Sequence, residues 1–191
     1  AVAWYDSSQS ASSMQIPDNS LAVVVTVRPE SSSLDAVKEL ARANSGTLGF
    51  LPAGAFQAAA EEGHLIAAQN MNGEVSGYLL FRVAANRASI IHLCVASSYR
   101  RLGIARKLFE HLAESTKHLR GISLRSRRDY EANSLWARLG FAAVSELPGR
   151  GRARKILTEW WYEHPHDTLF TFAASARSGR PPIDVAIDLN V

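Results

Sequence analysis

The sequence predicts a domain of mixed α/β class, with a central, mostly antiparallel sheet of about six or seven strands and about four flanking helices. Three observations lead to this prediction. Runs rich in β-branched residues alternate with amphipathic helical stretches along residues 19–165. Asn72-Gly73 is a strong hairpin turn, because both residues tolerate a positive φ. Residues 87–95 have apolar side chains on both faces, which is typical of a central strand.

Residues 19–63 are predicted to supply the first strand and two helices. The β-branched run LAVVVTVR, residues 21–28, has the length of a strand. Residues 33–44 place four apolar side chains on one helical stripe, and Gly46 lies just beyond the expected end. A weaker helix fits residues 52–63, which begin with proline and end with glycine.

A meander of three strands follows, and then strands and helices alternate. Residues 64–70 and 74–83 flank the Asn72-Gly73 turn, and residues 87–95 form the third strand of the meander. The later elements are a helix that ends near Ser115, a strand at 121–127, a helix at 130–140, and strands at 141–147 and 155–163. Asp129 is the expected N-cap of the 130–140 helix, and Gly140 is its expected C-cap.

Composition limits the class and the surroundings of the protein. The chain has 191 residues, of which 47% are hydrophobic and 20% charged, as in globular domains. No apolar run approaches the roughly 20 residues that cross a bilayer, so no membrane association is expected. Cys94 is the one cysteine, which excludes an internal disulfide and favours a cytoplasmic location. The net charge of +3 permits an anionic partner without requiring one.

The two ends differ in composition from the region between them. Residues 1–18 are rich in serine and lack periodicity, so we expect a mobile leader before a domain at 19–165. Residues 166–191 are expected to be a linker with a strand-like tail. The segment IDLNV resembles the first strand of PIN-type ribonucleases, with Asp188 at the position of a metal ligand. This resemblance implies that the chain is a fragment of a longer polypeptide. One strand cannot supply the several carboxylates of a nuclease metal site, so no nuclease activity is expected of this chain.

The stretch RRLGIA, Arg100 to Ala105, has the features of an anion site. Gly103 allows a tight turn and a close approach of the backbone to a ligand. The first amides of the following helix lack intrahelical acceptors and carry the positive end of its dipole. Arg100 and Arg101 add charge, so the turn is suited to phosphate. The alternative is an ordinary connection between a strand and a helix.

The context of this turn resembles the GCN5-related N-acetyltransferase (GNAT) family. RRLGIA matches the family's pattern (Q/R)-x-x-G-x-(G/A), Val95 precedes it, and DYEANSLWARLGF, residues 129–141, resembles the second family motif. The resemblance implies the GNAT fold over residues 19–165 and acetyl-CoA as cosubstrate, with no metal. It implies that pantetheine bonds to the main chain of Leu93 and Val95, and that the diphosphate binds amides of Arg101, Gly103, Ile104 and Ala105.

The catalytic residues are less defined. Many family members have a tyrosine acid where this chain has Trp136, and an indole cannot act as a general acid near neutral pH. We expect Trp136 to pack beside pantetheine, and Tyr130 is the nearest alternative phenol. His92 is the preferred base, expected on the same strand face as Ile90 and Cys94. Glu62, with Glu61, is the rival base, and each candidate could instead be structural.

The acceptor and partners stay open. The resemblance implies direct acetyl transfer to an amine of a small molecule or a macromolecule. The basic loop with Arg150, Arg152 and Arg154 lies beside aromatic residues and could bind RNA or tRNA, although charged hairpin loops are usually only solvated. Two alternatives are a degenerate domain that binds CoA or RNA, and an enzyme that acetylates aminoacyl-tRNA. The sequence does not fix the oligomeric state, and a homodimer is left open.

Overall fold

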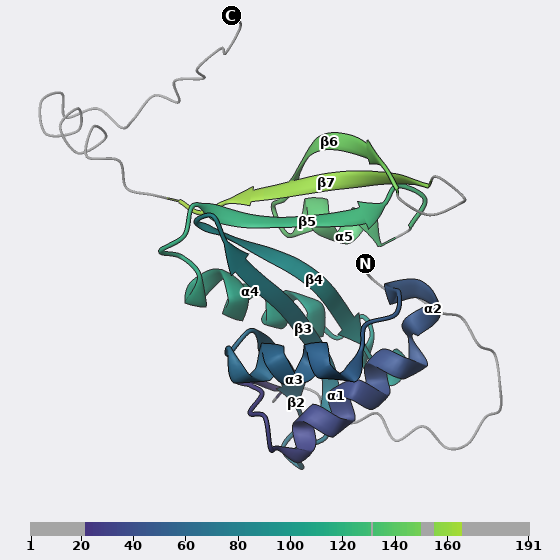
Figure 1. Ribbon diagram of the computed structural model, residues 1–191, viewed down its shortest axis with the longest axis vertical. Helices are drawn as coiled ribbons and strands as arrows, with labels where there is room; N and C mark the ends of the chain where they lie inside the picture. The colour runs from purple at the N-terminus through teal and green to yellow at the C-terminus, as the bar shows by residue number, and fades with distance from the viewer. Residues whose placement is uncertain (1–21, 131, 150–154, 166–191) are drawn as a thin grey trace, which may run out of the picture.

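A seven-stranded sheet dominates the computed structural model, which describes residues 22–130, 132–149 and 155–165 (Figure 1). The predicted leader 1–18 and tail 166–191 lie outside the described residues. The strands are β1 (Val23–Thr26), β2 (Leu65–Gln69), β3 (Val75–Ala84), β4 (Arg87–Val95), β5 (Gly121–Arg127), β6 (Ala142–Pro148) and β7 (Ile156–Glu163). The helices are α1 (Ser32–Ala43), α2 (Ser45–Leu48), α3 (Ala53–Glu61), α4 (Ile104–Ser115) and α5 (Asn133–Arg138). The predicted mixed class and mostly antiparallel sheet are confirmed.

The strand order β1-β2-β3-β4-β5-β7-β6 has a single parallel pair at its centre. β4 and β5 pair only from Arg87 opposite Gly121 to Ile90 opposite Leu124. Beyond that point β5 continues beside β7 as far as Arg127, and β4 continues beside β3 as far as Val95. The two central strands therefore diverge in the middle of the sheet, as Figure 1 shows.

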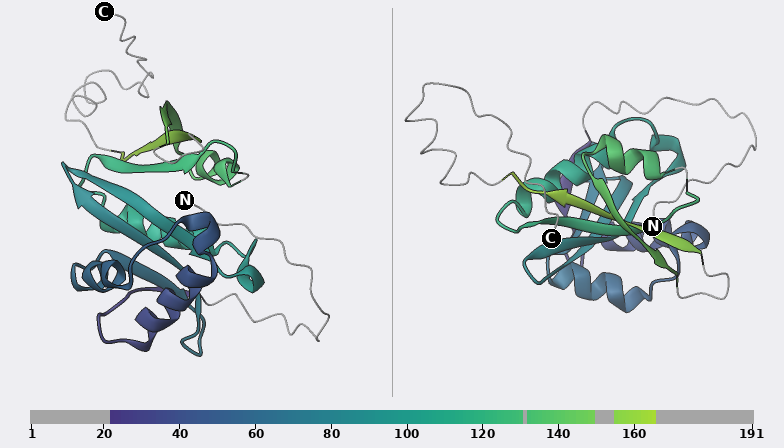
Figure 2. Two further views of the ribbon diagram at one scale, coloured as in Figure 1. Left: turned by 45° about the vertical axis from the view of Figure 1, so that its right-hand side comes forward. Right: turned by 90° about the horizontal axis from the view of Figure 1, so that it is seen from above.

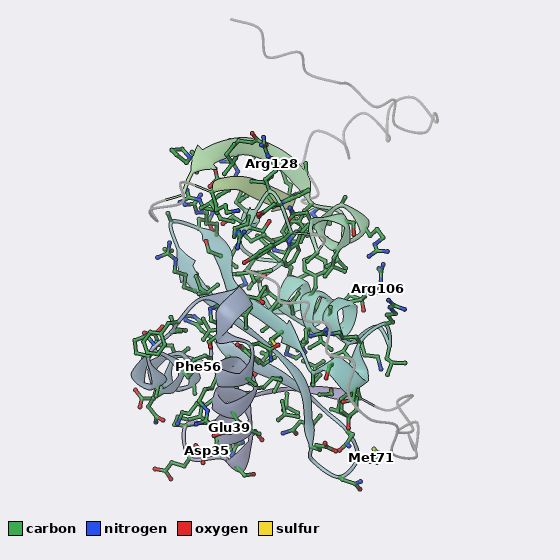
Figure 3. All side chains as sticks on the ribbon, turned by 90° about the vertical axis from the view of Figure 1, so that its right-hand side faces the viewer. Asp35, Glu39, Phe56, Met71, Arg106 and Arg128 are labelled. Carbon is green, nitrogen blue, oxygen red and sulfur yellow. The ribbon has the colours of Figure 1, made fainter. Side chains whose placement is uncertain are left out.

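Helices cover the two faces of the sheet (Figure 2). The first apolar cluster lies under α1, α2 and α3, and it includes Leu34, Val37, Leu48, Phe56 and Tyr78. The second cluster lies on the opposite face under α4 and α5, and it includes Leu93, Ile104, Leu108, Leu112 and Trp136. Figure 3 shows Phe56 near α1, whereas Arg106 projects from α4, and Arg128 and Met71 mark opposite ends of the molecule. Within the described ranges, no helix combines the length and apolarity that a membrane span requires.

A β-bulge in β4 makes the alternation of its side chains differ from the expected one. Leu80 pairs with His92 and Phe81 pairs with Ile90, so Ile91 is the extra residue. The bulge shifts the alternation by one residue, because side chains on a strand alternate with a period of two. Ile90 therefore packs in the α4 cluster, whereas Cys94 packs in the α1–α3 cluster. His92 and Cys94 therefore lie on the same face of β4, as expected. Ile90 lies on the opposite face, so the expectation that it shares a face with His92 was wrong.

Two details of the helices also differ from the prediction. α5 begins at Asn133, after an N-cap at Ala132, so Asp129 is not its cap. The Asp129 carboxylate instead accepts hydrogen bonds from Arg127 and Lys155, and these ion pairs compete with capping. α1 ends at Ala43, before Gly46 as expected, but Gly46 itself lies inside the short helix α2, which was not predicted.

Candidate functional site

The connection from β4 to α4 contains two residues in the left-handed region. A short 3-10 turn at Ser97–Tyr99 leads to Arg101, with φ of 63°, and to Gly103, with φ of 79°. Glycine adopts this conformation without the steric cost that a Cβ adds. A Cβ built on Gly103 would meet nothing within 4 Å, so the surface above this residue is open. Glycine is therefore favoured at position 103 by its left-handed backbone conformation and not by a lack of space for a side chain.

The start of α4 presents free backbone donors beside this turn. Gly103 is the N-cap, and the first intrahelical bond runs from the Lys107 N–H to the Gly103 carbonyl. The amides of Ile104, Ala105 and Arg106 therefore have no acceptor within the helix. Together with the helix dipole, such amides favour an anion, and phosphate is the common choice. The predicted anion-binding residues are brought together here.

A hydrogen-bond network fixes the approach to the turn. The Tyr99 hydroxyl donates to Glu74 Oε2 at 3.1 Å, and the Asn70 side-chain amide donates to the same oxygen at 3.0 Å. Asn70 and Glu74 belong to the β2–β3 hairpin, so this hairpin holds the 3-10 turn that precedes Arg100. No local sequence pattern indicates these contacts, because the partners lie about 25 to 30 positions apart along the chain.

The divergence of β4 from β5 leaves one edge of β4 available. The Ala96 N–H donates to the Ser76 carbonyl of the β3 side, and main-chain groups alternate between the two edges of a strand. The main-chain groups of Leu93 and Val95 therefore face the edge from which β5 has departed. An extended ligand could bond to this edge as an additional strand would.

Trp136 lies in the apolar cluster under α4 and α5. It is 1% exposed and contacts Phe141 edge to face, with 5.4 Å between ring centroids. Its indole N–H has no hydrogen-bond partner among the described residues. A buried donor without a partner is rare and costs roughly 1–3 kcal/mol, so a ligand acceptor at this position would be stabilising. The donor set thus fits a long ligand with phosphate and carbonyl oxygens.

His92 lies at the bottom of a pocket on the other face of β4. The pocket has a volume of about 240 Å³ and is lined by α1, the segment that follows it, and Phe56 of α3. His92 is 5% exposed, and its Nδ1 lies 3.2 Å from the Tyr78 hydroxyl oxygen. Burial lowers the pKa of His92 to about 4, so the imidazole is neutral near neutral pH. A neutral imidazole can accept a proton.

We expect the buried His92 to make stability depend on pH. Because its pKa falls from 6.5 to about 4 on folding, the unfolded chain binds more protons between these values. Stability is therefore complete above pH 6.5 and decreases as the pH falls toward 4. The free energy of unfolding should decrease by roughly 1 kcal/mol per pH unit across this window. Urea denaturation at a series of pH values measures this decrease, and His92→Gln should flatten it. Equal slopes for both proteins would contradict the assignment.

Tyr130 and Glu62 occupy different surroundings. The Tyr130 hydroxyl donates to the Thr47 carbonyl at 3.0 Å and accepts from Arg127 at 3.0 Å, so it joins α2 to the β5–α5 segment. Glu62 follows the end of α3, and its Oε2 lies 2.9 Å from His64 Nδ1. Glu62 is not among the residues that line the His92 pocket. The roles of Tyr130 and Glu62 stay predictions.

Cys94 is an unsuitable nucleophile. The side chain is buried beside Tyr78, and burial raises the pKa of its thiol to about 12. A thiolate is the reactive form of cysteine, and almost none is present near neutral pH at this pKa. In the described part of the chain, no group of three or more His, Cys, Asp or Glu residues is placed to hold a metal.

Three arginines at the end of β5 and just beyond it are paired with carboxylates. Arg125 contacts Glu159 at 2.9 Å, Arg127 contacts Asp129 at 2.6 Å, and Arg128 contacts Glu146 at 3.2 Å. Arg150, Arg152 and Arg154 lie outside the described residues. The charges near the β5 end are therefore partly neutralised within the protein.

Comparison with known proteins identifies the family of this arrangement. The family model described as acetyltransferase (GNAT) domain matches residues 47–152, which include the turn between β4 and α4 and helix α5. A relative named 5-NmdU N-acetyltransferase, from Pseudomonas phage PaMx11, is 30% identical over 106 residues, covering 54% of this chain and 74% of the relative.

Solved structures show the same fold. Ard1 from Thermoplasma volcanium superposes with a TM-score of 0.67 at 15% identity, covering 76% of this chain and 99% of that one. Arabidopsis thaliana NAA60, solved in complex with acetyl-CoA, superposes with a TM-score of 0.62 at 19% identity, covering 75% of this chain and 98% of that one.

Proposed function

Because the chain belongs to the GNAT acetyltransferase family, we propose that it transfers the acetyl group of acetyl-CoA directly to an amine. We assign this activity to residues 19–165. The observation that carries the proposal is the left-handed turn at Arg101 and Gly103, which ends in the free amides of α4 beside the open edge of β4. A long ligand with a diphosphate and amide groups matches both features at once.

The proposed cofactor position follows from these donors. The diphosphate is held by Arg100 and by the amides of Arg101, Gly103, Ile104 and Ala105, where the helix dipole favours negative charge. Pantetheine lies along the edge of β4 and bonds to the main chain of Leu93 and Val95. The Trp136 N–H has no partner among the described residues, and an oxygen of the same ligand is its proposed acceptor.

In the proposed reaction a C–N bond forms, a C–S bond breaks, and the amine nitrogen loses one proton. Acetyl-CoA supplies a thioester carbonyl, the amine nitrogen forms a C–N bond to it, and the C–S bond breaks with release of the CoA thiolate. The high pKa of Cys94 argues against an acyl-enzyme step and favours direct transfer. A thiolate is a fair leaving group, so the lack of a tyrosine at Trp136 is compatible with turnover.

Proton transfer is assigned to His92 first. The imidazole is neutral near neutral pH and lies in a pocket that an amine could enter. Burial disfavours the imidazolium, so His92 would pass the acceptor proton on to water rather than retain it. Tyr130 is proposed as the acid only if its hydroxyl leaves the Thr47 carbonyl. Glu62 is the weaker alternative base, because it does not line the pocket.

The acceptor class is an amine. The phage relative is named as an N-acetyltransferase of 5-NmdU, which makes a related acceptor one to test first. A second candidate function is a degenerate domain that binds CoA without turnover. It is favoured by Trp136 in place of the tyrosine and by the hydrogen bonds that occupy the Tyr130 hydroxyl.

Turnover separates these two functions. We expect the protein to bind acetyl-CoA in isothermal titration, and to release CoA thiol in a colorimetric assay with at least one amine from a panel. His92→Gln should lower kcat, with a smaller effect on acetyl-CoA affinity, because His92 lines the pocket under α1 and α3, on the opposite face of β4 from the α4 cluster. Binding without turnover on any amine would favour the degenerate domain, and absence of binding would refute both functions.

A further inference from the structure

A basic groove crosses the face of the sheet that α1–α3 leave uncovered at β5 and β7. It consists of two adjoining hollows of about 230 and 530 Å³, which share Arg87, Ser123 and Glu159. The first is also lined by Arg82, Ser89, Ile91 and Arg125, and the second by Ala85, Arg120, Val144 and Trp161. We call this continuous surface the sheet groove.

Positive charge predominates in the sheet groove. Four exposed arginines line it, namely Arg82, Arg87, Arg120 and Arg125, against one carboxylate, Glu159. Arg125 and Ser145 hold Glu159, and the hydrogen bond from Arg125 is the main reason that its pKa is lowered. Among the described residues, Arg82, Arg87 and Arg120 form no salt bridge. Three cations are therefore available to an anionic partner.

Tertiary structure places these three cations side by side. Arg82 and Arg87 flank the β3–β4 turn, and the Arg120 N–H donates to the Asn86 carbonyl of that turn at 2.9 Å. The Ser89 and Ser123 hydroxyls, 2.9 Å apart, form a polar floor between β4 and β5. A row of cations over a hydroxyl floor suits a chain of phosphates better than it suits an apolar ligand.

Trp161 adds an aromatic surface to the groove. Its side chain is half-buried and crosses Gly121, where any Cβ would approach the ring to 2.6 Å. The Arg120 guanidinium carbon lies 5.7 Å from the centre of the same ring. Aromatic rings beside arginine are the elements that bind unpaired bases by stacking.

The sheet groove also reaches the proposed reaction centre. Ile90 and Leu124, the last pair before β4 and β5 diverge, both line its first hollow. Ile91, the bulge residue next to His92, lines it as well. A ligand in the groove can thus extend toward the point at which the edge of β4 becomes available.

We propose that the sheet groove binds a single-stranded nucleic acid, and that the acceptor amine is carried on that strand. Arg82, Arg87 and Arg120 contact phosphates, and Trp161 stacks on one base. The second part rests on the proposed function, whereas binding of the strand does not. An acidic polypeptide could contact the arginines, but it has no bases to stack on Trp161.

Fluorescence anisotropy tests the groove with labelled oligothymidylate DNA and oligouridylate RNA of about 12 nucleotides. We expect the protein to bind at least one of the two oligonucleotides. If the protein contacts the 2′-hydroxyl, its affinities for the DNA and the RNA should differ. The triple variant Arg82→Gln, Arg87→Gln, Arg120→Gln should weaken it at least about tenfold and reduce the slope of log K against log salt by about 2. Trp161→Leu should weaken binding several-fold, by loss of one stack.

The matched control is Arg28→Gln, Lys117→Gln, Arg138→Gln, which removes the same charge from positions outside the groove. This control should retain the affinity and salt slope of the wild type. Equal losses in both triple variants, or tighter binding of a polyglutamate peptide of the same length, would overturn the proposal. Acetyl-CoA titration of the same proteins distinguishes the two hypotheses: no oligonucleotide binding with intact acetyl-CoA binding refutes the groove alone.

Discussion

Gly103→Glu is expected to raise the Kd for acetyl-CoA at least about a hundredfold, which corresponds to about 2.7 kcal/mol. The carboxylate would occupy the surface in front of the α4 amides, where the diphosphate is proposed to bind. Like charges at such short range repel strongly, and the new side chain also competes for the same amides. Isothermal titration measures the change.

The matched control is Gly63→Glu. Gly63 also has a left-handed φ, of 71° against 79° at Gly103, and a Cβ would meet nothing within 4 Å at either position. Both variants therefore bear similar backbone strain, roughly 1 kcal/mol, and the same added charge. Only Gly103→Glu should lose acetyl-CoA, while thermal unfolding shows both variants folded. Equal affinities in the two variants would refute the proposed diphosphate position.

Gly77→Val is expected to lower the free energy of unfolding by about 3 kcal/mol and to weaken acetyl-CoA binding as well. Gly77 lies on β3 opposite Val95, and a Cβ there would stand 2.8 Å from the Cys94 carbonyl oxygen and 3.1 Å from Ile104 Cγ2. The backbone of β3 or β4 must move to relieve the contact with the Cys94 carbonyl oxygen. The second contact displaces Ile104, the first residue of α4, and with it the amides at the start of the helix.

Gly54→Ala is the matched control for glycine replacement in a regular element. Gly54 lies in α3, its φ is not left-handed, and a Cβ would meet nothing within 4 Å. This change should leave stability unchanged or raise it by up to about 1 kcal/mol, because alanine favours a helix. Urea denaturation and titration of acetyl-CoA check both variants. A Gly77→Val protein with the stability of the wild type would contradict the close packing of α4 on β3.

Local sequence patterns predicted most elements, because each pattern reports forces that act within a few residues. The strands β4 and β5 were predicted at their observed bounds, and α1 within one residue. The turn before α4 could also be predicted, because a glycine before an amphipathic helix constrains the local backbone regardless of the remaining fold. Trp136 was recognised as a departure from the family pattern from its position alone.

Other features depend on contacts between distant segments. Asp129 was predicted as a cap, but Lys155, 26 positions away, and Arg127 draw its carboxylate into ion pairs. The arginines that cluster in sequence near the end of β5 have acidic partners in the fold, whereas the free cations of the sheet groove come from separate stretches. Their proximity arises only when β5 aligns with β4 and Arg120 contacts the β3–β4 turn.

Local sequence patterns were enough to predict the mixed α/β class, the order of the elements and the position of the turn before α4, because hydrophobic periodicity and backbone preference are local properties. Tertiary structure alone decided which face His92 occupies, how far its pKa falls, and which arginines remain available to a partner. The bulge at Ile91 exists only as a mismatch between two paired strands. Burial and charge pairing likewise depend on what the rest of the chain places around a side chain.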